Sequence, residues 1–161
     1  AEREHQNFIR LCLTWRTMAF AVIPVLAQIE GMIAQVLIEE LACHTDARGW
    51  VVEPLDETGL ARHRNVHVVW TEPGAVRGNH YHQQSTETVL LVGPALVRWR
   101  EAGTLRERHV NIGQALRFTF PPGIPHAMQN TGDRPLILAS FSTRPHDRNH
   151  PDTVREELIV P

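Results

Sequence analysis

Four side chains with affinity for metal ions lie near one another in the middle of the sequence. His80 and His82 are separated by one residue, Glu87 follows a short polar segment, and His126 follows the rigid segment ProProGlyIlePro. Residues two apart on a β-strand project from the same face, so both imidazoles of the first pair are expected on one side. Three imidazoles and one carboxylate suit Zn, Mn, Fe, Co or Ni and leave positions open for water or substrate. The pattern predicts a site for one divalent transition metal.

The other histidines have no comparable partners, and we expect them to have no metal role. They are His5, His44, His63, His67, His109, His146 and His150. All 16 basic residues are arginine, so lysine bases and Schiff-base chemistry are excluded. An acid–base catalyst must be His, Asp, Glu, Cys or Tyr81, and His67 and His109 are the candidates.

Four further polar residues are candidates for substrate binding: Arg77, Asn79, Arg98 and Arg100. Guanidinium groups can hold a pyrophosphate or a carboxylate by paired hydrogen bonds. Arg98 and Arg100 have a second interpretation, because residues two apart on a strand can equally form an exposed face. The same alternation places Trp99 on the opposite face, in the core.

Length, net charge and cysteine content limit the number of domains and the kinds of ligand that the chain can have. A chain of 161 residues suits one domain with a single hydrophobic core. The formal net charge of −2 gives no basic field for a phosphate backbone, so no nucleic-acid partner is expected. Cys12 and Cys43 stand far apart without a CxxC spacing, which indicates neither a disulfide framework nor a cysteine zinc site. We therefore expect a cytoplasmic protein.

Residues 18–29 form the only long apolar run, and a run of this kind has three interpretations. The run is too short for a membrane span and Pro24 interrupts it, so no membrane association is expected. It could be the apolar part of a weak secretion signal, but Glu2 and Glu4 argue against this. We favour the third interpretation, an N-terminal extension over 1–31 followed by one domain over 32–161.

The elements that must position these side chains are predicted to be short β-strands. From residue 33 onward, runs of five to eight residues alternate with turn residues, a pattern typical of a sandwich or barrel. Leu116, Phe118 and Phe120 share one face and should lie in the core. Only residues 3–20 and 152–159 have helical patterns. The predicted strands are 34–41, 50–54, 65–71, 79–83, 87–92, 95–101, 107–111, 115–120, 126–130 and 135–142.

On these motifs the sequence resembles the cupin superfamily. The first cupin motif has the form G(X)5HXH(X)3–4E(X)6G, and the chain matches it from Gly74 through His80, His82 and Glu87, with Gly93 one residue early. The second has the form G(X)5PXG(X)2H(X)3N, and here its proline, second glycine, histidine and asparagine fall in place. They are Pro121, Gly123, His126 and Asn130, while Gly113 lies two residues further upstream than the motif requires. The resemblance implies an all-β fold, a jelly-roll antiparallel β-barrel, with the metal on the four residues named above.

A closer resemblance covers residues 45–158. The phrases ArgGlyAsnHisTyrHis, ProProGlyIleProHis and AsnHisProAspThr are similar to the sugar-nucleotide cupins, nearest the C-terminal cupin domain of reductase–epimerases that make UDP-N-acetyl-L-fucosamine for capsular polysaccharide. This resemblance implies zinc as the favoured metal, a nucleotide sugar as substrate and a homodimer. The family tends to carry a lysine just before the glutamate ligand, whereas this chain has Ser85 and Thr86 there.

Two classes of function follow from this pattern. The first is an enzyme, in which a metal with open positions acidifies the C–H beside a ketone and a base removes the proton. Epimerisation or isomerisation of a keto sugar nucleotide needs this chemistry, and an iron-dependent cupin dioxygenase would use the same ligands. The second class is a non-catalytic cupin that binds a sugar or small acid, because a fold alone does not decide function.

Overall fold

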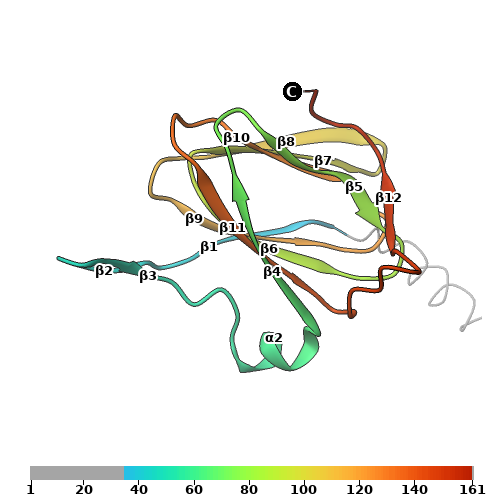
Figure 1. The fold of residues 1–161 in the computed structure, drawn as a ribbon, viewed down its shortest axis with the longest axis horizontal. Helices are drawn as coiled ribbons and strands as arrows, with labels where there is room; N and C mark the ends of the chain where they lie inside the picture. The colour runs from blue at the N-terminus through green and yellow to red at the C-terminus, as the bar shows by residue number, and fades with distance from the viewer. Residues whose placement is uncertain (1–34, 161) are drawn as a thin grey trace, which may run out of the picture. The chain divides into compact units, whose positions relative to one another are not determined.

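Antiparallel β-strands make up most of the chain that the computed structural model describes, residues 35–160 (Figure 1). The predicted all-β class is confirmed. In chain order the elements are β1 (Leu37–Glu40), β2 (His44–Asp46), β3 (Gly49–Val51), α2 (Glu57–Arg62), β4 (Asn65–Thr71), β5 (Val76–His82), β6 (Glu87–Val92), β7 (Ala95–Glu101), β8 (Thr104–Val110), β9 (Ala115–Phe120), β10 (His126–Asn130), β11 (Leu136–Ser142) and β12 (Thr153–Arg155).

The strands form two five-stranded sheets and a separate hairpin. The first sheet has the order β1-β9-β6-β11-β4, the second has the order β12-β5-β10-β7-β8, and β2 pairs with β3. No ladder between described strands joins the two sheets, so the barrel is open and β4 and β12 are edge strands. Val89, Phe118 and Leu138 from the first sheet pack with Val97 and Met128 from the second, so the core lies between the sheets.

Alternation along each strand determines which side chains enter this core. On β9, Leu116, Phe118 and Phe120 are 1%, 0% and 1% exposed, whereas Arg117 between them is only half-buried. Trp99 on β7 is also buried. Both predictions from the period of two residues are confirmed, because a pleated strand turns successive side chains to opposite faces.

Most strand predictions match the structure closely. The predicted ranges 65–71, 87–92, 95–101, 115–120 and 126–130 coincide with β4, β6, β7, β9 and β10. The sequence patterns did not indicate β2 or the short helix α2. The signal for α2 was local: the Asp56 carboxylate accepts a hydrogen bond of 2.7 Å from the Gly59 backbone N–H and so caps the helix.

The helical prediction for 152–159 is wrong. Residues Thr153–Arg155 form β12, which pairs with β5 so that Thr153 lies opposite His82 and Arg155 opposite His80. Pairing with an edge strand outweighs the weak helical preference of these residues. This correction matters for the site, because β12 lies beside the strand that carries two of the predicted ligands.

The predicted helix over 3–20 and the predicted extension over 1–31 lie outside the described residues. Both stay predictions, as does the division of the chain into this extension and one domain over 32–161. Within residues 35–160 no helix is long and apolar enough to cross a membrane.

Candidate metal centre

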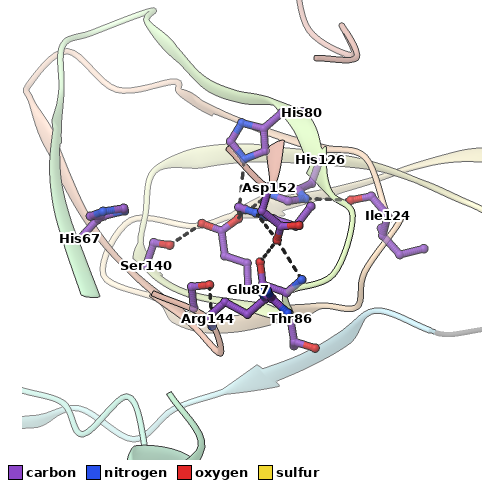
Figure 2. A network of polar contacts seen from close by, with 12 residues as sticks. His67, His80, Thr86, Glu87, Ile124, His126, Ser140, Arg144 and Asp152 are labelled. Atoms are coloured by element: carbon purple, nitrogen blue, oxygen red, sulfur yellow. Dashed lines mark hydrogen bonds and ion pairs between the residues drawn. The ribbon is translucent and has the colours of Figure 1, made fainter. Parts of the chain in front are cut away.

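The four predicted ligands come together between the two sheets. Their ligand atoms all lie within 4.8 Å of one another. His80 and His82 come from the end of β5, and His126 comes from β10, where it lies opposite His80 in the ladder. Glu87 begins β6 of the other sheet, so the cluster bridges both layers (Figure 2).

The Glu87 carboxylate is the centre of this cluster. Its Oε2 atom lies 2.7 Å from His126 Nε2, 3.1 Å from His82 Nε2 and 3.8 Å from His80 Nε2. The other oxygen, Oε1, accepts a hydrogen bond from the Ser140 hydroxyl. The His80 Nε2 atom is buried and has no hydrogen-bond partner within residues 35–160. Three imidazole nitrogens and one carboxylate oxygen thus face one point, and the His80 nitrogen has no partner there among the described residues. This arrangement fits a divalent transition metal.

The imidazole of His126 is held in the orientation that a ligand needs. Its Nδ1 atom lies 2.9 Å from the Ile124 carbonyl oxygen, which can only accept, so Nδ1 carries the proton. The ring also stacks on Phe120 at 4.2 Å between centroids and 11° between planes. The Nε2 lone pair is thereby directed to the cluster, as in metal sites where a carbonyl fixes the tautomer.

The electrostatics of the cluster favour positive charge beside Glu87. Burial raises the pKa of Glu87, but the facing imidazoles of His126, His80 and His82 outweigh it and hold the pKa well below its ordinary value. Burial lowers the pKa of His82, but the hydrogen bond and charge of Glu87, together with Asp152, leave that pKa raised. The carboxylate is therefore ionised, and the field that holds a proton on an imidazole also favours a bound cation.

A cavity of about 350 Å³ opens beside the cluster, and His82 and Glu87 form part of its wall. Two other strands of the first sheet also line the cavity, β11 with Ser140 and β4 with His67. The segment between β11 and β12 supplies the rim, including Arg144 and further polar side chains of residues 145–152. The volume lies within the range of small-molecule sites.

Comparison with known proteins shows the family. Residues 44–154 match the model of the polysaccharide biosynthesis C-terminal domain. The chain belongs to this family. Over 119 residues it is 30% identical to UDP-2-acetamido-2,6-β-L-arabino-hexul-4-ose reductase of Pseudomonas aeruginosa, a match that covers 71% of the chain and 31% of the reductase. It thus spans about a third of the length of this relative.

Solved structures agree with this membership. The capsular polysaccharide assembling protein CapF from Staphylococcus aureus matches 73% of the chain and 33% of its own length, with 27% identity and a TM-score of 0.55. A dTDP sugar isomerase from Desulfovibrio desulfuricans matches 76% of the chain and 84% of its own length, with 18% identity and a TM-score of 0.63. The second likeness concerns the fold alone. The resemblance to sugar-nucleotide cupins is confirmed.

The two candidate catalytic histidines of this polysaccharide biosynthesis domain lie in different places. His67 lines the cavity, where its Nε2 atom is 3.1 Å from the Asn65 side-chain amide nitrogen and its ring meets that of His146 at 5.7 Å. His109 lies on β8, the edge strand of the second sheet, is exposed and is not part of the cavity wall. Of the two, the structure brings only His67 near the predicted ligands.

None of the four candidate substrate-binding residues lines the cavity of this domain. Arg98 and Arg100 bond to Glu107 and Glu156, each at 2.9 Å, and form the half-exposed strand face that was their alternative interpretation. Alternation explains this, because the buried Trp99 between them occupies the inward position.

Arg77 and Asn79 bond to neighbouring parts of the chain. The Arg77 guanidinium donates to the Trp70 carbonyl and to the Thr71 hydroxyl. Asn79 is buried with a φ of 55°, and its amide donates to the Ile159 carbonyl and accepts from the backbone N–H groups of Leu158 and Ile159. Asparagine tolerates this left-handed conformation better than most residues. It anchors the C-terminal segment.

Sequence reasoning missed Ser140, Arg144 and Asp152. Ser140 occupies an inward position of β11, where an otherwise apolar stripe becomes polar. Asp152 belongs to the phrase AsnHisProAspThr, which carried the closer family resemblance. That phrase was the available signal for the rim, but it gave no indication of which ligand the segment would face.

Proposed function

We propose that this domain binds one divalent metal ion, zinc favoured, and moves a proton beside the carbonyl of a keto sugar nucleotide, as an epimerase or isomerase. The observation that carries the proposal is the convergence of His80, His82, Glu87 and His126 on one point beside a cavity. The family membership and the name of the Pseudomonas relative, which acts on a UDP-linked keto sugar, support the substrate class.

The metal, when bound, would act as a Lewis acid on the substrate's carbonyl oxygen and lower the pKa of the adjacent C–H. The residues of the chain supply the other functions. His67 is our candidate for the group that accepts or returns the proton, because it is an imidazole that lines the same cavity as Glu87. The amide of Asn65 contacts its ring and holds it against the cavity wall.

Arg144 replaces Arg77, Arg98 and Arg100 as our candidate for holding the diphosphate. It lies on the rim of the cavity, and its guanidinium has no hydrogen-bond or ion-pair partner within residues 35–160. Its backbone N–H is held by the Ser142 hydroxyl at 3.3 Å. A free guanidinium presents paired N–H groups that match a phosphate.

A homodimer is part of the proposal. On the edge strand β4 the outward-facing Val66, Val68 and Trp70 are exposed by 56%, 73% and 56%, and Ile137 on the neighbouring β11 by 54%. Adjacent exposed apolar side chains of this kind support an interface between protein surfaces. Sedimentation equilibrium should give twice the mass of the chain, and an unchanged monomer at high concentration would contradict it.

The test of the function combines metal content with proton exchange. Purified protein should contain one first-row metal ion per chain, and His82→Ala should remove most of it. In D₂O with a UDP-linked 4-keto-6-deoxy sugar, deuterium should enter the carbon beside the carbonyl faster than in buffer alone. His67→Ala should slow this exchange by about 10²–10⁴-fold at unchanged metal content. His109→Ala is the matched control, because His109 lies outside the cavity and should exchange as the wild type does.

Three results would contradict the proposal in different ways. Full metal content after loss of both His80 and His82 would exclude the assigned site. Oxygen consumption with another substrate class would favour an iron dioxygenase. Tight binding of a nucleotide sugar without any exchange would favour a non-catalytic binding protein.

A further inference from the structure

We infer that Asp152 is a positioning residue for the metal site: it orients His82 and fixes the turn that joins His82 to Glu87. Asp152 lies at the end of the rim segment, just before β12, and its side chain is directed to the turn that follows β5 (Figure 2). The inference rests on the proposed metal function, because it assigns a role to Asp152 within that site.

The turn between the two ligands depends on Asp152 for much of its hydrogen bonding. Its Oδ1 atom accepts from the Gln84 backbone N–H at 2.9 Å, and its Oδ2 atom accepts from the Ser85 backbone N–H at 2.9 Å and from the Ser85 hydroxyl. Its backbone carbonyl accepts from the Gln83 N–H at 2.9 Å. One residue thus holds three consecutive positions between His82 and Glu87, so it limits how far these ligands can move apart.

The same carboxylate faces the second nitrogen of His82. While His82 Nε2 points to Glu87, its Nδ1 atom lies 3.6 Å from Asp152 Oδ2. This Nδ1 atom is buried and has no hydrogen-bond partner within residues 35–160. A distance of 3.6 Å is too long for a hydrogen bond, but a small rotation of the ring would close it. Asp152 is therefore placed to accept a hydrogen bond from a proton on His82 Nδ1.

This contact favours metal binding through Nε2 of His82. A neutral imidazole carries one proton, and an adjacent carboxylate favours that proton on the nitrogen that faces it. Glu87 faces Nε2 in the same way, but a metal ion bound between Nε2 and Glu87 would take the Nε2 lone pair, which leaves the proton on Nδ1 and Asp152 as its acceptor. Carboxylates placed behind ligand histidines fix the ring and increase its basicity in many metal sites. Asp152 would do for His82 what the Ile124 carbonyl does for His126.

The two contributions of Asp152 can be separated by mutation. Asp152→Asn keeps the size of the side chain but replaces the charged oxygen that faces Ser85 and His82 by an amide. Ser85→Ala removes a hydrogen bond between the turn and Asp152 and leaves the carboxylate beside His82. A role limited to the turn predicts similar effects from both changes, whereas a role through His82 predicts a much larger effect from Asp152→Asn.

The experiment measures Zn²⁺ and Co²⁺ affinity of the full chain by competition with a chelator. We expect Asp152→Asn to weaken binding by about 10–100-fold and Asp152→Glu to restore part of it. Ser85→Ala should weaken binding by about fivefold or less, the usual effect of one lost hydrogen bond. In the zinc-bound wild type, where coordination through Nε2 leaves the proton on Nδ1, NMR should show the His82 Nδ1–H signal shifted downfield and protected from exchange by a hydrogen bond to the Asp152 carboxylate, a readout that a role limited to the turn does not produce.

The outcomes distinguish this inference from the proposed function. If the wild type binds neither metal, the proposed function fails. If the wild type binds metal and Asp152→Asn binds it equally well, or if Ser85→Ala loses as much affinity as Asp152→Asn, only the role of Asp152 through His82 is overturned. If Asp152→Asn does not fold, the NMR measurement on the wild type decides, because a His82 Nδ1–H that exchanges freely and shows no hydrogen bond would contradict the inference.

Discussion

The two ends of the space between the sheets differ in chemistry, although the same strands build both. On β6 the inward positions are Glu87, Val89 and Leu91. On the neighbouring β11, Ser140 lies toward the Glu87 end and Leu138 lies beside Leu91. At one end the inward side chains are a carboxylate and a hydroxyl. At the other they are aliphatic and, with β9, form part of the core. The polarity of the interior therefore changes within one strand.

This difference separates stability from chemistry. The apolar end removes hydrocarbon from water and supplies most of the favourable free energy of folding. The polar end buries a carboxylate, which is costly unless charges and hydrogen bonds compensate it. Glu87 is 8% exposed and is compensated by three imidazoles and the Ser140 hydroxyl. Substitutions at the two ends should consequently affect different measurements.

The largest effect on stability is expected at the apolar end. Phe118 is fully buried and stacks on Phe120, so Phe118→Ala should leave a cavity and lower the free energy of unfolding by about 3–5 kcal/mol. Denaturation in guanidinium chloride measures it. Leu105→Ala on β8, where the side chain is 48% exposed, is the control and should cost far less. A loss below about 1 kcal/mol for Phe118→Ala would show that this end is not tightly packed.

The next effect concerns the polar end and depends on the metal. Zinc at one hundred times its dissociation constant should raise the wild-type free energy of unfolding by about 2.7 kcal/mol. Glu87→Gln should abolish this increase, because it removes the charge on which the imidazoles converge. Glu107→Gln, at an exposed ion pair on β8, is the matched control and should keep the increase. Equal zinc stabilisation in both variants would place the metal elsewhere.

The sequence allowed the four candidate ligands to be predicted because each belongs to a short motif. His80 and His82 share a strand face, and Glu87 and His126 follow turns at fixed spacings, so local rules suffice. The inward stripe of β9 was predictable for the same reason. Local periodicity also contained the evidence against Arg98 and Arg100, since an inward Trp99 requires outward neighbours.

Residues whose roles depend on tertiary pairing were not predictable in this way. Asp152 reaches the turn after β5 because β12 pairs with β5, and its helical pattern gave the opposite expectation. Ser140 contacts Glu87 because β11 and β6 are neighbours in the first sheet, although 53 residues separate the two side chains in the chain. No local pattern in the sequence specifies which strand will lie beside which.

The smallest effect tests how sharply polarity changes along β6. Val89 is fully buried one inward position from Glu87, whereas Val68 on the outer face of β4 is 73% exposed. Val89→Thr should lower the free energy of unfolding by about 1–3 kcal/mol, because it buries a hydroxyl group without a hydrogen-bond partner. Val68→Thr makes the same change where water can bond the hydroxyl, and should stay within about 0.5 kcal/mol of the wild type. Both variants keep a β-branched side chain in a strand, so β-propensity contributes little to the difference. Urea denaturation of the metal-free proteins measures the two free energies of unfolding.

If Val89→Thr lowers the free energy of unfolding no more than Val68→Thr does, the new hydroxyl has found a hydrogen-bond partner beside Glu87. The polar end would then extend one position deeper than the burial of Val89 indicates.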